Sequence, residues 1–297
     1  MIQVKDQIYH LGLRDWEIRS FHGHELSTFH GSSYNSYLIK DEKTVLVDVV
    51  WTPHSKEFIS ILENEVGIDN IDFIIINHSE PDHSGALAEI MERRPDIPIY
   101  CSVKGVETIR KQFHKDWNFR AVKTGDTINI GMYELVFVDM TMIHWPDSMM
   151  TFVKGPNVLL SNDAFGQHLA GASIFEDELD QCMVWHEAIK YYANILTPFA
   201  PLIRKKIDEI LAMNLPIEMI APSHGAIWRK EPLRIVEKYV QWSDNYNEGY
   251  VTIVYDTMYN ATKKMAGAIA RGLESRGIKS KQFNISATDM NELMTEL

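Results

Sequence analysis

The chain has 297 residues, of which 45% are hydrophobic and 24% charged, and its formal net charge is −12. This composition is typical of globular proteins, and the length favours two domains. The negative charge argues against nucleic acid as a partner and against binding to anionic membranes. No apolar stretch approaches about 18 residues, and the N-terminus lacks the apolar core of a signal peptide. We therefore expect a cytoplasmic protein with no membrane partner.

The first 248 residues alternate strand-like and helix-like segments, which predicts two sheets with helices outside them. The expected strands are 34–39 and 44–50 (a hairpin), 73–77, 97–102, 120–123, 134–139, 150–154, 158–161 and 219–222. The expected helices are 55–65, 85–94, one starting at 106, 177–213 with a break near Pro198 and Pro201, and 231–245.

A second unit is expected from residue 249, with a buried parallel strand at 251–255, a helix at 263–276, a strand near 281–285 and the start of a helix at 289–297. The loop between the first strand and helix is rich in hydroxyl and amide groups. A helix N-terminus after such a loop can bind a phosphate group, although an ordinary βα turn looks similar. The candidate phosphate-binding residues are Thr257, Met258, Tyr259, Asn260, Ala261 and Thr262.

The segment 73–85 carries the strongest chemical signal. Its isoleucine-rich run predicts a strand buried on both faces, and it ends in four candidate metal ligands with the spacing H-x-E-x-D-H. In extended backbone His78 and Glu80 point the same way and can reach one ion. Asp82 and His83 follow the bend at Pro81 and can face a second ion. The simpler interpretation is a polar loop that caps the helix at 85–94.

Three other strand ends support a metal site. His144 follows the strand 134–139, Asp163 follows the apolar run 158–161, and His224 follows the short strand 219–222. Candidate ligands at four strand ends are better explained by one site than by four coincidences.

These residues resemble those of the flavodiiron proteins, or A-type flavoproteins, which have a metallo-β-lactamase-like domain followed by a flavodoxin-like domain. The resemblance extends from the first residues to about Tyr255 and beyond. Its further motifs are Asp15-Trp16, His22-Gly23, GSSYNSYLI at 31–39, HWPDSM at 144–149, SNDAFGQ at 161–167 and YYANI at 191–195. The expected fold class is thus an α/β, metallo-β-lactamase-like αββα sandwich followed by an incomplete flavodoxin-like unit.

The resemblance implies a pair of iron ions. His78, Glu80 and His144 would bind one iron, Asp82, His83 and His224 the other, and Asp163 would bridge them. Zinc hydrolases of the same fold typically have a histidine where Glu80 stands, and the added carboxylate suits iron. The negative charges of three carboxylates and one hydroxide would balance the positive charges of two ferrous ions. They would equally balance those of two zinc ions.

The resemblance further implies reduction of dioxygen to water, of nitric oxide to nitrous oxide, or of both. Electrons would come from FMN in the partner subunit of a head-to-tail homodimer. FMN would in turn be reduced by rubredoxin, a flavin reductase or a deazaflavin. His22 and Tyr191 match residues near the iron centre and are candidate donors of hydrogen bonds or protons, although each could also be an ordinary packed side chain.

The chain departs from the family in its second unit. The domains are expected at 1–248 and 249–297, whereas a complete flavodoxin-like domain needs roughly 140–150 residues. The loops that enclose the flavin ring are missing, which argues against FMN binding by this chain alone. We expect either a fragment or a natural truncation, and the chain could be inactive by itself.

Two other functions are open from the sequence. The first is a zinc-dependent hydrolase of the metallo-β-lactamase fold that acts on a thioester, lactam or phosphodiester through metal-bound hydroxide. The second is a non-catalytic diiron sensor of oxygen, for which no signalling output is evident.

Overall fold

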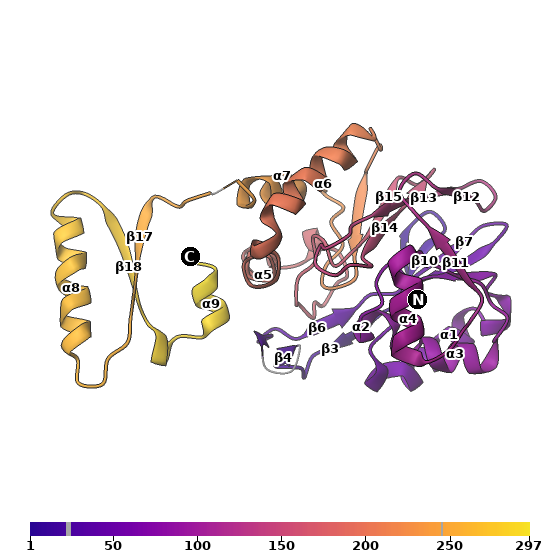
Figure 1. Cartoon of the computed structure of the whole chain (residues 1–297), viewed down its shortest axis with the longest axis horizontal. Helices are drawn as coiled ribbons and strands as arrows, with labels where there is room; N and C mark the ends of the chain where they lie inside the picture. Colours follow the sequence, from indigo (N-terminus) through magenta and orange to yellow (C-terminus); the bar gives the residue numbers. More distant parts are fainter. Residues whose placement is uncertain (22–24, 245) are drawn as a thin grey trace.

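The computed structural model describes residues 1–21, 25–244 and 246–297. Its N-terminal part contains two sheets that pack face to face, with helices on both outer faces (Figure 1). The seven-stranded sheet has the order β1 (Ile2–Lys5), β2 (Ile8–His10), β7 (Tyr37–Lys40), β8 (Thr44–Val47), β9 (Phe73–Ile75), β10 (Ile99–Ser102) and β11 (Phe119–Val122). The five-stranded sheet has the order β12 (Thr127–Asn129), β13 (Glu134–Asp139), β14 (Met149–Lys154), β15 (Val158–Asn162) and β16 (Met219–Pro222).

Alternation along the strands produces the four layers, because successive side chains face opposite sides of a sheet. In β9, Ile74 packs outward with Phe58 of α1, whereas Ile75 faces Phe137 of the other sheet. In β13, Val138 packs outward against the helices of the second layer. Helices on the first sheet are α1 (Ser55–Glu65), α3 (Leu87–Arg93) and α4 (Val103–Phe113), and those on the second are α5 (Gln181–Tyr191), α6 (Ala200–Ala212) and α7 (Leu233–Trp242).

Short elements connect these layers. Two small ribbons pair β3 (Leu13–Asp15) with β6 (Ser32–Tyr34) and β4 (Ser20–Phe21) with β5 (Leu26–Ser27). One short helix, α2 (Pro81–Ser84), follows β9. A π turn and single 3₁₀ turns complete this part at Thr52–His54, Ile68–Asn70, Glu176–Glu178, Tyr192–Leu196 (the π turn) and Thr197–Phe199.

The predicted elements agree with the structure in type, with two corrections. The predicted strand 34–39 is wrong as a single element, because β6 ends at Tyr34 and β7 starts at Tyr37 in another sheet. Between them, the backbone N–H of Asn35 donates to Ser223 O at 2.8 Å instead of joining either ladder. The short strands β1 to β5 and the exposed edge strand β12 were not predicted.

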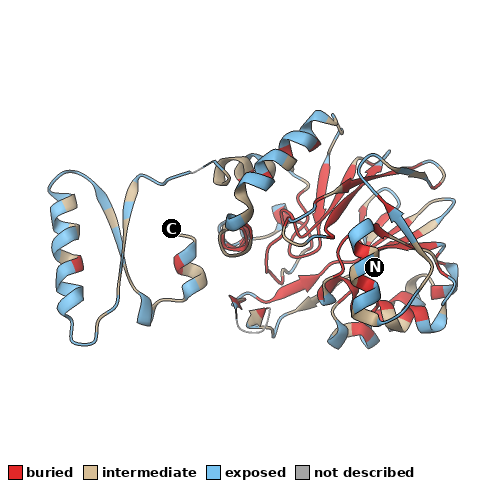
Figure 2. Cartoon of the chain, in the orientation of Figure 1, coloured by how far each residue is buried: buried red, intermediate tan, exposed pale blue. Residues whose placement is uncertain are grey.

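The C-terminal unit is a βαβ arrangement in which β17 (Tyr250–Tyr255) and β18 (Lys279–Asn284) pair in parallel through α8 (Ala261–Glu274). The prediction that strand 251–255 is buried is wrong for this chain, because no residue of β17 is buried. The reason is that β17 has one neighbouring strand and one covering helix within the described residues. Figure 2 shows the resulting contrast between this unit and the buried interior of the N-terminal part.

The last helix, α9 (Met290–Met294), follows a 3₁₀ turn (Ile285–Ala287) and lies against α5 and the π turn. Glu292 contacts His186 at 2.8 Å and Lys190 at 2.7 Å. Asn291 donates to Asn194 Oδ1 at 2.8 Å and accepts from Ser27 N at 2.7 Å. Within the described ranges, no helix is both long enough and apolar enough to span a membrane.

Candidate metal centre

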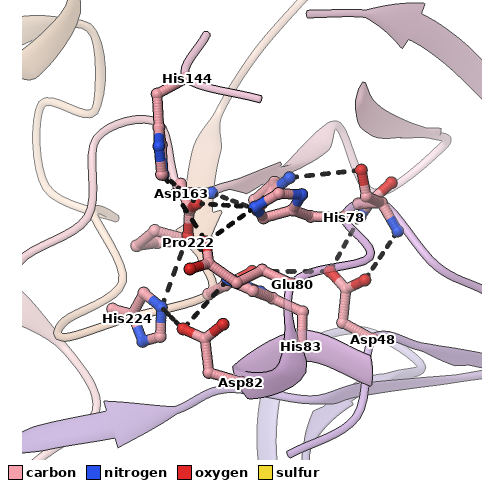
Figure 3. A network of polar contacts seen from close by, with 12 residues as sticks. Asp48, His78, Glu80, Asp82, His83, His144, Asp163, Pro222 and His224 are labelled. Carbon is pink, nitrogen blue, oxygen red and sulfur yellow. Dashed lines mark hydrogen bonds and ion pairs between the residues drawn. The ribbon is translucent and has the colours of Figure 1, made fainter. Parts of the chain in front are cut away.

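The seven predicted metal ligands converge at one end of the two sheets (Figure 3). His78 and Glu80 follow β9, and α2 carries Asp82 and His83. The other three ligands come from the second sheet, in which His144 lies between β13 and β14, Asp163 directly follows β15 and His224 follows β16. The centre is thus assembled from loops at the ends of strands that the double-layered core holds in place.

The ligands form two groups with ligand atoms within 4.8 Å of one another. One contains His78, Glu80, His144 and Asp163, and the other contains Asp82, His83 and His224. This division is the one that the resemblance implies.

Asp163 lies between the two groups. Its Oδ2 is 3.1 Å from His144 Nε2 and 3.7 Å from His78 Nε2. Its Oδ1 is 3.0 Å from His83 Nε2 and 3.5 Å from His224 Nε2. One carboxylate oxygen therefore faces each group, which is the arrangement that a bridging ligand requires.

The electrostatics of the cluster indicate a cation site. Burial alone would raise the pKa of Asp163, but His83 and His144 hold it well below its usual range. Burial would likewise lower the pKa of His78, but Asp147, Glu80 and Asp163 hold it well above. Buried carboxylates packed this closely against imidazoles stabilise a positive charge between them. In the metal-free chain a proton on an imidazole supplies this charge, and a bound divalent ion can replace that proton.

A second observation fits a metal. Asp82 Oδ1 is buried and has no hydrogen-bond partner among the described residues, whereas Asp82 Oδ2 lies 3.0 Å from His224 Nε2. Buried carboxylate oxygens are normally paired, so an ion in this half of the centre would supply the missing partner. The donor set of imidazoles and carboxylates suits iron, and it also suits zinc.

The protonation of the centre predicts a pH dependence for the metal-free chain. Burial alone would lower the pKa of His83, but the carboxylates of Asp82 and Asp163 raise it from 6.5 to about 9. A raised pKa means that the proton stabilises the fold fully below pH 6.5 and that this contribution is lost as the pH rises through about 9. Its upper bound is about 3 kcal/mol.

We therefore expect the melting temperature of the metal-free chain to fall between pH 6.5 and 9. Metal affinity should rise over the same range, because bound ions displace the proton. Calorimetry and metal titration at several pH values measure both trends. His83→Gln should weaken the pH dependence of stability, and an unchanged dependence in this variant would contradict the assignment.

A side chain and a backbone carbonyl group behind the ligands orient them, and the sequence did not single these out. Asp147 Oδ2 accepts a hydrogen bond from Ser79 N at 2.7 Å and lies 3.3 Å from His78 Nδ1. His224 Nδ1 donates to Ser33 O at 2.6 Å. Both contacts place the ring proton on Nδ1 and leave Nε2 for a metal. A signal was available for Asp147, which lies in the motif at 144–149.

Asp147→Asn should therefore lower metal affinity about 10–100-fold, as is typical for such orienting carboxylates. Burial would raise the pKa of Asp147, but the contact with His78 and the N–H of Ser79 lower it to about 2, so it is ionised at neutral pH. Competition with a chelator measures the affinity. The exposed Asp96 offers a matched control, and Asp96→Asn should leave the metal affinity unchanged. Equal metal affinities for the Asp147 and Asp96 variants would contradict the orienting role of Asp147.

The two predicted proton donors have different outcomes. Tyr191 is buried at the end of α5, and its ring centroid lies 5.1 Å from that of His168, which in turn lies 5.3 Å from His224. Burial, with Asp163 nearby, raises the pKa of Tyr191 well above its usual range, so it keeps its proton at neutral pH. His22 lies outside the described residues. His168 was left unassigned from the sequence, which offered no signal for it.

The candidate phosphate-binding residues lie apart from the metal centre, between β17 and α8. Met258 and Tyr259 are exposed, and Asn260 precedes the first turn of α8. Thr257 N donates to Asp256 Oδ1 at 2.8 Å. Phosphate binding by this loop stays a prediction.

Comparisons with known proteins match both parts of the chain. Residues 33–225 match the family described as ODP family beta lactamase, and residues 253–297 match flavodoxin. The chain is 51% identical over 300 residues to the anaerobic nitric oxide reductase flavorubredoxin of Escherichia coli O1:K1. That alignment covers all of this chain and 63% of the relative, so the chain spans less than two thirds of the relative's length.

Two solved structures are also similar. Rubredoxin oxygen:oxidoreductase from Desulfovibrio gigas superposes with a TM-score of 0.94 at 34% identity, covering 99% of this chain and 74% of that one. The flavodiiron protein from Giardia intestinalis gives a TM-score of 0.91 at 32% identity, covering 98% and 71%.

Fold and site together define a metallo-β-lactamase-like protein with a two-part metal centre and the beginning of a flavodoxin-like domain. The chain belongs to the flavodiiron protein family. The fold class and the family expected from the sequence are thereby confirmed.

Proposed function

We propose that the chain carries the diiron centre of an oxidoreductase that reduces nitric oxide to nitrous oxide, dioxygen to water, or both. The observation that carries this proposal is the placement of Asp163, which directs one oxygen toward each of two ligand groups. The similar proteins support the reaction class, since one is a nitric oxide reductase and another an oxygen:oxidoreductase.

The proposed ligands are His78, Glu80 and His144 for one iron and Asp82, His83 and His224 for the other, with Asp163 as the bridge. When bound, the two ferrous ions would supply two electrons and the positions at which a diatomic substrate binds. The three carboxylates keep the loaded centre close to neutral, which limits the cost of burying two dications.

The protein's own residues would control access and proton supply. A pocket of about 620 Å³ opens onto the first ligand group and is lined by Glu80, His144, Trp145, Asn291 and Met294, among others. We propose that substrate and electrons enter here. Tyr191, which holds its proton at neutral pH, would donate a hydrogen bond or a proton, and His22 stays a candidate for the same role.

The remaining assignments are proposals from family membership. We propose domains at 1–248 and 249–297, with FMN as the electron relay and 257–262 as its phosphate loop. Rubredoxin, a flavin reductase or a deazaflavin would supply electrons to a head-to-tail homodimer in the cytoplasm. The higher identity to the nitric oxide reductase favours nitric oxide as the first substrate to test.

A single-turnover experiment tests the proposed chemistry without FMN. The iron-loaded chain is reduced, freed of reductant and mixed anaerobically with nitric oxide. Two nitric oxide molecules, two electrons and two protons give one nitrous oxide and one water, so we expect one nitrous oxide per diiron centre. In a parallel run, dioxygen replaces nitric oxide. Oxidation of the reduced centre in that run, together with no nitrous oxide in the first, would shift the assignment to dioxygen. Hydrolysis of a thioester, lactam or phosphodiester by a zinc-loaded chain would instead support the hydrolase.

A further inference from the structure

A buried carboxylate lies one helical turn before Tyr191. The Glu187 side chain on α5 is 2% exposed, and its Oε1 lies 2.8 Å from Nδ1 of His30. The His30 side chain, between β5 and β6, is 42% exposed. The pair therefore joins an imidazole in contact with solvent to a carboxylate inside the protein.

A small cavity lies on the inner side of this pair. It has a volume of about 10 Å³ and is lined by Glu187, His168 and Tyr191, among other residues. This volume, with polar groups around it, suits about one water molecule. Since the ring of His168 lies 5.3 Å from that of the ligand His224, the cavity lies near the second ligand group. It also borders the pocket at Glu80 and His144, with which it shares Leu26, Asn194, Ile195 and Asn291 as lining residues.

The proposed reaction consumes protons as well as electrons. Neither His30 nor Glu187 lines the pocket at Glu80 and His144, so protons that enter through this pair leave the pocket itself clear for a flavin. We propose that His30 and Glu187 form a proton path and deliver protons from solvent to the cavity beside Tyr191 and His168. This inference rests on the proposed function and goes beyond it by assigning two residues outside the metal centre.

The transfer needs no further reactant. The Nδ1 proton of protonated His30 passes to Glu187 Oε1, and His30 regains a proton from solvent. Glu187 then passes a proton to a water in the cavity, so that two such events supply the two protons used with two electrons for each nitrous oxide.

Other charged and titratable groups face this pair. On α5, Lys190 pairs with Glu292 of α9 and lies 4.9 Å from the ring of Phe29, and Tyr191 and His186 are its neighbours along the helix. His168 and Lys190 line the same cavity as Glu187. The ammonium group of Lys190 forms its ion pair with Glu292. The hydrogen-bond partner of the Glu187 carboxylate is therefore His30.

A purely structural role would be to attach the β5–β6 segment to α5. Glu187→Gln keeps the shape and a hydrogen-bonding group but cannot carry a proton. The chain also contains a matched control pair on the same helix, because His186, 44% exposed, contacts Glu292 at 2.8 Å without lining the cavity. His186→Gln thus removes a similar imidazole–carboxylate contact away from the path.

The test is the single-turnover reaction with nitric oxide, run in H₂O and D₂O. Glu187→Gln and His30→Gln should slow nitrous oxide formation, the former at least about tenfold, with a larger solvent isotope effect. Added imidazole should partly rescue His30→Gln, because the side chain of His30 is in contact with solvent. His186→Gln should match the unaltered chain, and all variants should keep their iron. Unchanged rates in both path variants, or slow rates without rescue and with an unchanged isotope effect, would overturn the proposal.

An infrared titration of the metal-free chain separates failure of this path from failure of the proposed function. As the pH is lowered, a carboxyl band of Glu187 should appear, shift in D₂O and be missing in Glu187→Gln. A Glu187 that never gains a proton from solvent would refute the path even if the chain reduces nitric oxide. If the unaltered chain reduces neither nitric oxide nor dioxygen, the proposed function fails while this titration still decides the path.

Discussion

Replacing Asp163 by asparagine should remove metal from both halves of the centre. Each oxygen of Asp163 faces a different ligand group, at 3.1 Å from His144 and 3.0 Å from His83. Asparagine offers one carbonyl oxygen and one NH₂ group, and the latter cannot bind a cation. Because even orienting residues behind the ligands cost 10–100-fold in affinity, loss of a shared ligand should cost more than about 100-fold at each position.

Metal content by mass spectrometry measures this effect, and Asp82→Asn is the control. Asp82 belongs to the second group alone, so its replacement should mainly empty that half and leave the first occupied. If Asp163→Asn retained both metals and the single-turnover activity, the bridging role would be wrong. Equal losses in the two variants would show that Asp163 is no more central than Asp82.

Replacing Asp48 by alanine should destabilise the metal-free chain by about 2–4 kcal/mol, because it leaves buried N–H donors of Asn77 without their acceptor. The Asp48 carboxylate accepts from Asn77 N at 2.7 Å and from Asn77 Nδ2 at 3.2 Å. Asp48 also has a φ of 53°, a region that disfavours alanine. Since Asn77 immediately precedes His78, the same change should disturb the first ligand.

Asp48→Asn separates these contributions. Asparagine tolerates positive φ and keeps one oxygen for the N–H of Asn77. Burial raises the pKa of Asp48 to about 6, so removal of its charge also relieves a buried anion above that pH. Urea denaturation at pH 7 should thus show a much smaller loss for Asp48→Asn than for Asp48→Ala. A loss below about 1 kcal/mol for the alanine variant would show that the network is not needed for stability.

The sequence predicted the layered fold because each layer has a local signature. Residues 55–65 and 134–139 form α1 and β13 at their predicted limits, since amphipathic periodicity and apolar alternation define such segments. Strand β12 was not predicted because it is a short edge strand with little apolar content. The exposure of β17 could not be predicted, because burial of a strand depends on neighbouring strands and helices that its own residue pattern does not specify.

The seven candidate ligands were recognisable because each follows a strand, and the ends of neighbouring strands meet. The groups behind them could not be found in this way. Asp48 and Asn77 are 29 positions apart, and His78 and Asp147 are 69 positions apart. Glu187 and His30 are 157 positions apart. Such pairs arise only when the two sheets and their covering helices pack, and no local pattern marks them.

The central claim is that this chain holds two iron ions, and elemental analysis of anaerobically purified protein tests it most directly. We expect about two irons per chain with little zinc, because the carboxylate of Glu80 favours iron. Two zinc ions per chain from iron-replete cells would contradict it and would favour the hydrolase. A chain that binds no metal would contradict the assignment of the seven ligands.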